Sequence, residues 1–209
     1  MAELNIRGLY YLAHIDNLSL LLERGILSQK IRAEENIQYA RIADSNIVGR
    51  RRYKQTPDEK SLWDYANLFF QPRNPMLYRV IDEKGKQNLT VFRIANTVLQ
   101  EQGIFITDGI AANSQTQFYR LSEGLEMFQT HHEIIQSDSW ISWNHDPDLR
   151  RKLMAECLVP NQVDPKYIQQ FIVSDHVVAN SLRGHLSAAN TQKLVVASDM
   201  GSDIFTPFN

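Results

Sequence analysis

The chain has 209 residues, a formal net charge of −2, and apolar and charged fractions of 43% and 22%. This length suits one domain with a real core, and the charge argues against a protein that coats duplex DNA, which would usually be strongly basic. No apolar run approaches membrane-spanning length, and the start, Met1 to Asn5, lacks the regions of a signal peptide. A single cysteine, Cys157, rules out an internal disulfide and indicates a reducing cytoplasm.

The N-terminal stretch predicts a strand, a polar turn and a short helix. Residues 8–13 are apolar and aromatic, which indicates a first strand. Asp16 or Asn17 can then cap a helix that has leucines on one face and ends at Gly25. This arrangement leaves backbone groups exposed at a strand end, where a nucleotide could bind, although His14 could equally help to cap the helix.

An arginine run, residues 50–54, stands out in the polar segment 29–61. Most basic runs form a solvated face. This run follows Ile47 to Gly49, so it can also emerge from an ordered turn, and guanidinium groups form bidentate bonds to phosphate or carboxylate.

The aromatic segment from Leu62 to Tyr78 predicts a strand that runs into a cleft and bends there. Pro72 and Pro75 remove backbone donors and fix φ, so the residues between them must be extended or turned. A core strand followed by a proline turn is the plainer interpretation.

The middle of the chain alternates short elements. Residues 79–94 predict a hairpin, 95–102 a short helix closed by Gly103, and 104–107 a strand. Residues 108–117 form a polar loop that is long enough to be functional, and 118–128 have helical spacing. We expect no metal at His131 and His132, because adjacent histidines on a regular helix cannot both bind one ion.

Two tryptophans, Trp140 and Trp143, precede a helix that Asp146 and Pro147 should begin. Buried tryptophans would be core anchors, whereas exposed ones would stack on the bases of a single strand. The remaining C-terminal segments predict helices at 164–165 onward and 176–189, and strands at 171–174 and 194–197, without evident chemistry.

One glutamate lies in a late strand, where residues 154–159 alternate. Glu156 shares a face with Met154 and Leu158, and Cys157 points to the opposite face, which argues against a nucleophilic thiol. A carboxylate among apolar residues needs partners. It is either a structural residue bonded to a loop or an arginine, or a proton-transfer group in a partly dry cleft.

The run from Pro72 to Tyr78, after the arginine run and before the late-strand glutamate, resembles the DarT family of DNA ADP-ribosyltransferase toxins. The resemblance implies an α+β fold of the ADP-ribosyltransferase type, with split central β-sheets around an NAD cleft, in one domain over 1–209. Related enzymes place a ribose-binding histidine where Tyr11 stands, and a histidine is common at the position of Trp63.

The resemblance also assigns the site residues. Its catalytic residues would be Glu156 and Arg51, and no metal is implied. The NAD contacts would be Tyr11, Ala13, His14, Asn17, Gly25, Arg51 and Met76, and the DNA contacts Arg50, Arg52, Arg73 and Trp143.

The implied activity is transfer of ADP-ribose from NAD to guanine or thymine in single-stranded DNA, by a toxin that a macrodomain-type antitoxin or another ADP-ribose hydrolase opposes. The loop near Trp63 leaves the base open, with guanine slightly preferred. A carboxylate can stabilise the developing sugar cation and take a proton from the base, and an arginine can hold the pyrophosphate. An enzyme acting on RNA or protein, such as a 2′-phosphotransferase, and a non-catalytic nucleic-acid-binding module remain as alternatives.

Overall fold

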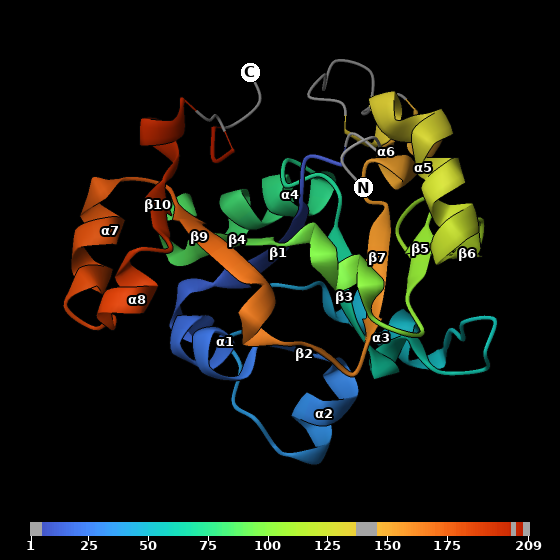
Figure 1. The fold of residues 1–209 in the computed structure, drawn as a ribbon, viewed down its shortest axis with the longest axis horizontal. Coiled ribbons are helices and arrows are strands. Elements are labelled where there is room, and N and C mark those ends of the chain that lie inside the picture. Colours follow the sequence, from blue (N-terminus) through green and yellow to red (C-terminus); the bar gives the residue numbers. More distant parts are fainter. Residues whose placement is uncertain (1–5, 137–145, 202–203, 207–209) are drawn as a thin grey trace.

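The computed structural model describes residues 6–136, 146–201 and 204–206. An eight-stranded sheet with the strand order β10-β9-β4-β1-β3-β7-β5-β6 crosses the molecule (Figure 1). Its strands are β1 (Leu9–His14), β3 (Tyr65–Phe69), β4 (Leu89–Ile94), β5 (Phe105–Thr107), β6 (Phe118–Arg120), β7 (Glu156–Pro160), β9 (Ile168–Val173) and β10 (Leu194–Val196). A second, two-stranded sheet joins β2 (Ile26–Leu27) to β8 (Gln162–Val163).

The large sheet consists of two halves that meet at a single point. β1 pairs with β4 along its whole length, and β3 pairs with β7 in the same way. Between β1 and β3, the described strands share one register pair, Tyr10 with Phe69. The expected α+β fold with a split central sheet is therefore confirmed.

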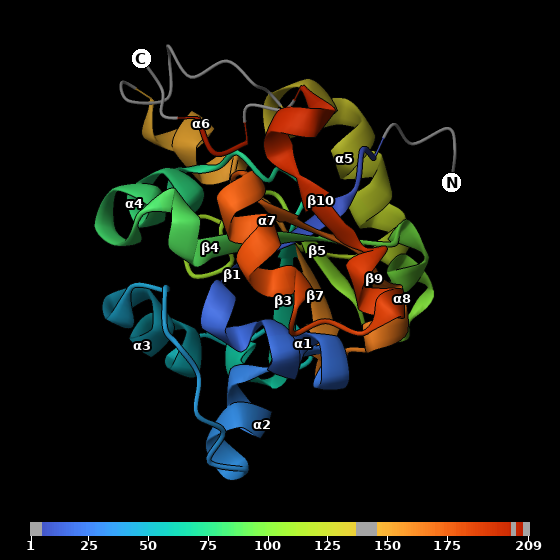
Figure 2. The same ribbon diagram turned by 90° about the vertical axis from the view of Figure 1, so that its left-hand side faces the viewer.

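Helices cover both faces of this sheet. They are α1 (Leu18–Arg24), α2 (Gln29–Glu34), α3 (Ser45–Tyr53), α4 (Pro75–Lys84), α5 (Leu121–Ile135), α6 (Pro147–Lys152), α7 (His176–Arg183) and α8 (Ala188–Thr191). Figure 2 shows α3 and α4 toward one side of the molecule and α5 toward the other.

The main core lies on the face that packs with α1 and α5, where Leu21 and Phe128 meet the strand residues Phe92, Cys157 and Phe171. On the opposite face, α4 contributes a smaller cluster with β1, β4 and β9.

The helix α4 corrects two expectations. Asn74 caps it by accepting hydrogen bonds from the backbone N–H groups of Met76 and Leu77 at 3.0 and 3.1 Å, and Pro75 occupies the first turn. The strand after Leu62 therefore ends at Phe69, and no bent strand continues to Tyr78. The hairpin predicted over 79–94 is also wrong, because its first half belongs to α4 and only its second half is a strand.

Three further boundaries differ from the sequence prediction. The arginine run lies on α3 and not on a turn, since Asp44 accepts from two backbone N–H groups and starts a helix there. Residues 118–120 pair with β5 as a strand before α5 begins. The predicted helix 176–189 is divided into α7 and α8.

Candidate active site

A buried ion pair joins the two halves of the chain. The side chain of Arg51 points inward from α3, while Arg50 and Arg52 are exposed on its outer side. Glu156, the first residue of β7, is only 1% exposed. Nη1 of Arg51 donates hydrogen bonds to Oε2 and Oε1 of Glu156 at 2.9 and 3.2 Å. The structure thus brings together the two residues predicted to be catalytic, which are 105 positions apart.

The second terminal nitrogen of Arg51, Nη2, is buried and has no hydrogen-bond partner within the described part of the chain. Leaving such a donor unsatisfied costs about 1–3 kcal/mol, or more for a charged group. The guanidinium is therefore bound to Glu156 through Nη1 alone, and Nη2 can donate to a further acceptor. A phosphate or sugar oxygen of a nucleotide fits this donor.

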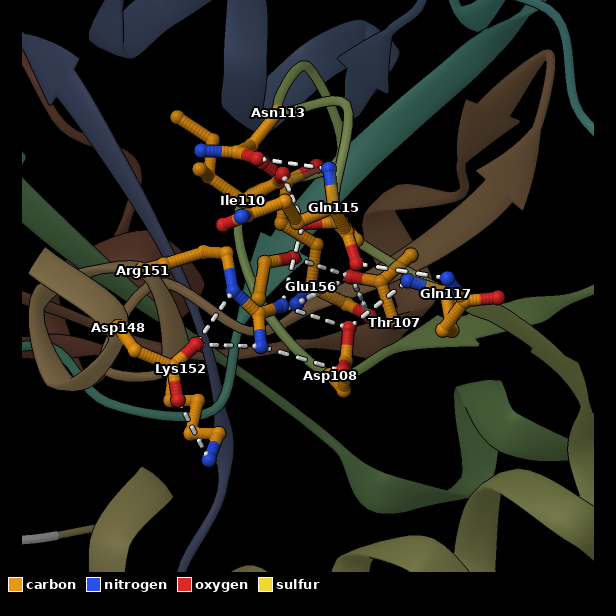
Figure 3. A network of polar contacts seen from close by, with 12 residues as sticks. Thr107, Asp108, Ile110, Asn113, Gln115, Gln117, Asp148, Arg151, Lys152 and Glu156 are labelled. Carbon is orange, nitrogen blue, oxygen red and sulfur yellow. Dashed lines mark hydrogen bonds and ion pairs between the residues drawn. The ribbon is translucent and has the colours of Figure 1, made fainter.

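The backbone of Glu156 is fixed by the hydroxyl of Thr107, at the end of β5 (Figure 3). The Glu156 N–H donates to Thr107 Oγ1 at 3.0 Å, and this hydroxyl donates to the carbonyl of Gly109 at 2.7 Å. The backbone at Glu156 is thereby coupled to the start of the loop 108–117.

Lys54 lies between α3 and this loop. Its Nζ donates to the carbonyl of Asn113 and lies 5.0 Å from the centroid of the Phe118 ring. Burial lowers the pKa of Lys54, and the positive charges of Arg51 and Arg151 lower it further against the opposing effect of nearby carboxylates. The sequence placed Lys54 in the basic run but gave no sign of this position.

The predicted NAD residues lie mainly at the end of β1. The hydroxyl of Tyr11 is 2.8 Å from that of Tyr39, and the guanidinium of Arg32 lies 4.3 Å from the Tyr39 ring centroid. Burial raises the pKa of Tyr39 well above its usual value, so this phenol stays neutral. Register pairs align Tyr10, Phe69 and Glu156 on one face of the sheet, which places Tyr11 on the other face.

Asn17 connects this strand end to a distant segment. Its side-chain amide exchanges two hydrogen bonds with the backbone of Ala40, at 2.9 Å to the carbonyl and 2.8 Å from the N–H. His14 accepts from the backbone N–H of Asp16 at 3.3 Å, and Ala13 is fully buried. The segment around Ala40 is therefore held beside the start of α1 by the side chain of Asn17.

Two other predicted NAD residues have evident packing roles. Gly25 has a φ of 76°, and a Cβ there would lie 2.0 Å from the carbonyl oxygen of Val163, so only glycine fits. Met76 lies in the first turn of α4 and packs against the smaller cluster.

The predicted DNA residues occupy different environments. Arg50 and Arg52 are exposed, and the guanidinium of Arg52 lies 5.1 Å from the ring centroid of Trp63. The Trp63 indole N–H donates to the Val48 carbonyl at 3.0 Å, so this side chain anchors the helix. Arg73 is buried. Trp143, like Trp140, lies outside the described residues.

No cluster of metal-ligating side chains is found in the described ranges. There, His131 and His132 contact carbonyl oxygens of their own helix, at 3.1 Å to Met127 and 2.8 Å to Gln129. Within the same ranges, no helix has the length and apolar character needed to cross a membrane.

Comparison with known proteins gives one consistent family. A family model described as "DarT: ssDNA thymidine ADP-ribosyltransferase" matches residues 10–202. A DNA ADP-ribosyl transferase–DNA ADP-ribosyl glycohydrolase fusion protein of Thermosipho africanus is 42% identical over 194 residues, which cover 92% of this chain and 48% of the relative. A DNA ADP-ribosyl transferase of Thermus sp. is 31% identical over 161 residues, or 72% of this chain and 73% of the relative. The chain therefore spans about half the length of the fusion protein.

Solved structures agree. Thermosipho africanus DarTG in complex with ADP-ribose matches with a TM-score of 0.78 and 39% identity, over 91% of this chain and 49% of that one. Thermus sp. 2.9 DarT in complex with ADP-ribosylated single-stranded DNA matches with a TM-score of 0.76 over 93% and 95% of the two chains. At 24% identity, this second match shows the fold alone.

Proposed function

Because the chain belongs to the DarT family, we propose that it transfers ADP-ribose from NAD to a nucleobase of single-stranded DNA and releases nicotinamide. The observation that carries this proposal is the buried contact of Arg51 with Glu156, in which Nη2 of Arg51 remains available to a ligand. A guanidinium donor suits an oxygen of an anionic dinucleotide, and the adjacent carboxylate suits a sugar on which positive charge develops.

Each of the two side chains has a role in the proposed reaction. The bond between the ribose C1′ and the nicotinamide nitrogen breaks, and its electron pair leaves with the neutral nicotinamide. Glu156 stabilises the positive charge that develops on the sugar, and it accepts the proton that the base nitrogen loses as it bonds to C1′. Arg51 orients the carboxylate with Nη1 and binds an oxygen of NAD with Nη2.

We place NAD along the end of β1 and the start of α1, in contact with Ala13, His14 and Asn17. The predicted contacts of Tyr11, Gly25 and Met76 stay part of the proposal. Tyr11 and Asn17 would also act indirectly, because their side chains hydrogen-bond to Tyr39 and Ala40 and so hold that segment beside the NAD site.

The DNA strand would approach over the exposed side of α3, where Arg50 and Arg52 can meet its phosphates. The proposal for Arg73 and Trp143 rests on the family resemblance alone. Trp63 is committed to α3, so its position gives no support to a preference for guanine. We propose thymidine as the first acceptor to test, since the family is described by it, with guanine as the alternative.

We further propose that residues 1–209 act as one transferase domain in the cytoplasm. An ADP-ribosyl glycohydrolase, such as a macrodomain-type antitoxin, would oppose it. The fusion of both activities in the Thermosipho relative supports this pairing.

The intact mass of mixed-sequence oligonucleotides after incubation with protein and NAD tests the proposal. We expect one ADP-ribose to be added to single-stranded DNA, with duplex DNA, RNA and a carrier protein as alternative acceptors. Fragmentation of the product identifies the base. Glu156→Gln, which keeps the shape of the side chain, should lower the rate by about 10²–10⁴-fold. Transfer to RNA or protein alone would refute a DNA acceptor, and full activity of Glu156→Gln would refute the catalytic assignment.

A further inference from the structure

A second buried guanidinium, that of Arg151 near the end of α6, lies against the loop 108–117, where it contacts Asp108 and Thr116 (Figure 3). It is 7% exposed, and each of its three guanidinium nitrogens has a hydrogen-bond partner. Nη1 donates to Asp108 Oδ1 at 2.8 Å and to Thr116 Oγ1 at 3.3 Å. Nη2 donates to Asp108 Oδ2 at 3.3 Å and lies 2.9 Å from Asp148 Oδ1, to which Nε donates at 3.0 Å. The guanidinium of Arg151 is thus engaged by the loop on one side and by Asp148 of its own helix on the other.

The loop is wound tightly around this side chain. A Cβ on Gly109 would lie 2.6 Å from Nη1 and 2.7 Å from Cγ of Arg151, so the backbone passes where no larger residue fits. The Ile110 N–H donates to the Arg151 carbonyl at 3.1 Å, and the Thr116 hydroxyl donates to the Ile110 carbonyl at 2.8 Å. The Gln117 N–H donates to Asp108 Oδ1 at 2.9 Å, which closes the loop at its other end.

The same loop is hydrogen-bonded to residues on both sides of the candidate active site. At its start, the Thr107 hydroxyl links the Gly109 carbonyl to the backbone N–H of Glu156. In its middle, the Asn113 carbonyl accepts from Lys54, three residues after Arg51. A shift of the loop would therefore displace the backbone at Glu156 and the side chain of Lys54, which follows α3.

We propose that Arg151 is a positioning residue, whose buried guanidinium holds the loop 108–117 as a rigid wall beside Glu156 against which the acceptor strand is placed. This inference rests on the proposed function. Arg151 acts through Asp108 and Thr116 and does not touch the substrate. A displacement of reacting groups by about 1 Å can cost about 10²-fold in rate, so a loosened wall lowers transfer strongly.

Steady-state kinetics with the full chain tests the proposal, with the NAD and oligonucleotide concentrations varied separately. In Arg151→Met, kcat/KM for the oligonucleotide should fall about tenfold to a hundredfold, while the KM for NAD changes less than about twofold. Arg151→Lys keeps the charge but cannot form the fork, so it should restore part of the loss. Asp108→Asn weakens the same contact from the loop side, and it should give a smaller loss in the same direction if Arg151→Met does not fold.

Phe171→Leu is the control for stability, because it removes volume from the main core at β9, which four other strands separate from β5 and the start of this loop. It should lower the melting temperature without changing kcat/KM for the oligonucleotide at a temperature where it is folded. The proposal would be overturned if Phe171→Leu lowered kcat/KM for the oligonucleotide as much as Arg151→Met does. It would also be overturned if Arg151→Met raised the KM for NAD to the same extent, since Arg151 would then be a general structural residue.

Hydrogen exchange gives a readout that does not depend on activity. The amides of Ile110 and Gln117, whose acceptors are the Arg151 carbonyl and Asp108, should exchange faster in Arg151→Met, whereas amides of β4 should not. Unchanged exchange at both loop amides would overturn the proposal even if the wild-type chain modifies no DNA. An inactive wild type with faster loop exchange in the variant would refute the proposed function and leave the positioning of the loop supported.

Discussion

The buried pair of Arg51 and Glu156 should stabilise the fold only as a pair. In Arg51→Met, the carboxylate of Glu156 is left in a site that is 1% exposed, and in Glu156→Leu the guanidinium is left in a site that is 7% exposed. Removal of one partner of a buried pair costs about 3–5 kcal/mol in the free energy of unfolding. For a chain of this size, each kcal/mol lowers the melting temperature by about 2–4 °C.

The double variant Arg51→Met with Glu156→Leu removes both charges. Replacement of a buried pair by apolar groups is often neutral or stabilising by about 1–4 kcal/mol. We therefore expect the double variant to be at least as stable as the wild type and to have no transferase activity. Stability and function would then be separated at one site.

Urea unfolding followed by fluorescence of the three tryptophans measures the four free energies of this cycle. The exposed pair of Arg24 and Glu35, whose side chains are 38% and 46% exposed, provides the matched control, since such pairs contribute about 0–1 kcal/mol. A double variant that is as unstable as the sum of its single variants would refute the reasoning, as would one that still modifies DNA.

Three further predictions concern packing, reactivity and pH. Gly124→Ala should lower the free energy of unfolding by about 1–3 kcal/mol, because the added Cβ would lie 2.6 Å from a β5 side chain. Gly184→Ala should be neutral or stabilising, because no atom lies within 4 Å of the added Cβ. Thermal melts of both variants check this contrast. Burial raises the pKa of the Cys157 thiol far above its usual value, so the folded protein should not react with iodoacetamide and Cys157→Ala should remain active; labelling of the native thiol would contradict this. The backbone N–H of Val178 and other donors lower the pKa of Asp175, the cap of α7, so its contribution to stability is complete above the unfolded-state pKa and is lost as pH falls through the lower folded-state pKa. The stability difference between the wild type and Asp175→Asn should therefore be present at pH 6 and should disappear below about pH 4. An equal difference in unfolding free energy at pH 3 and at pH 6 would contradict this sign.

Local sequence rules predicted the elements whose signals are strong and short-range. The strand and helix before Gly25 and the alternation around Glu156 required only the period of the side chains and a terminal residue. Proximity of Arg51 to Glu156 had no local signal, because it depends on how α3 packs against a strand 105 residues later. The family resemblance supplied this pair, and the structure gives it geometry.

Sequence patterns missed α4 and the role of Arg151 for physical reasons. Asn74 and Pro75 form a strong helix-start signal, but two prolines close together also fit a turn, and the turn interpretation hid α4. Arg151 lies in a basic stretch of α6 that is typical of a solvated helix. Its burial follows from a loop 43 positions earlier in the chain, which wraps around it. Neither periodicity nor composition reports such a contact.

The single register pair between β1 and β3 affects how easily substitutions could weaken an inhibitor that binds beside these strands. Apart from Tyr10 and Phe69, the described residues of β1 and β3 form no register pair with each other, so the facing edges of the two strands carry main-chain N–H and C=O groups that no ladder joins. Substitutions alter side chains but keep the peptide groups, so these edges keep their hydrogen-bonding groups when a side chain such as that of Tyr11 is replaced. An inhibitor that hydrogen-bonds to the backbone at this junction would therefore meet few escape mutations, whereas one that depends on the Tyr11 side chain would lose affinity with a single codon change.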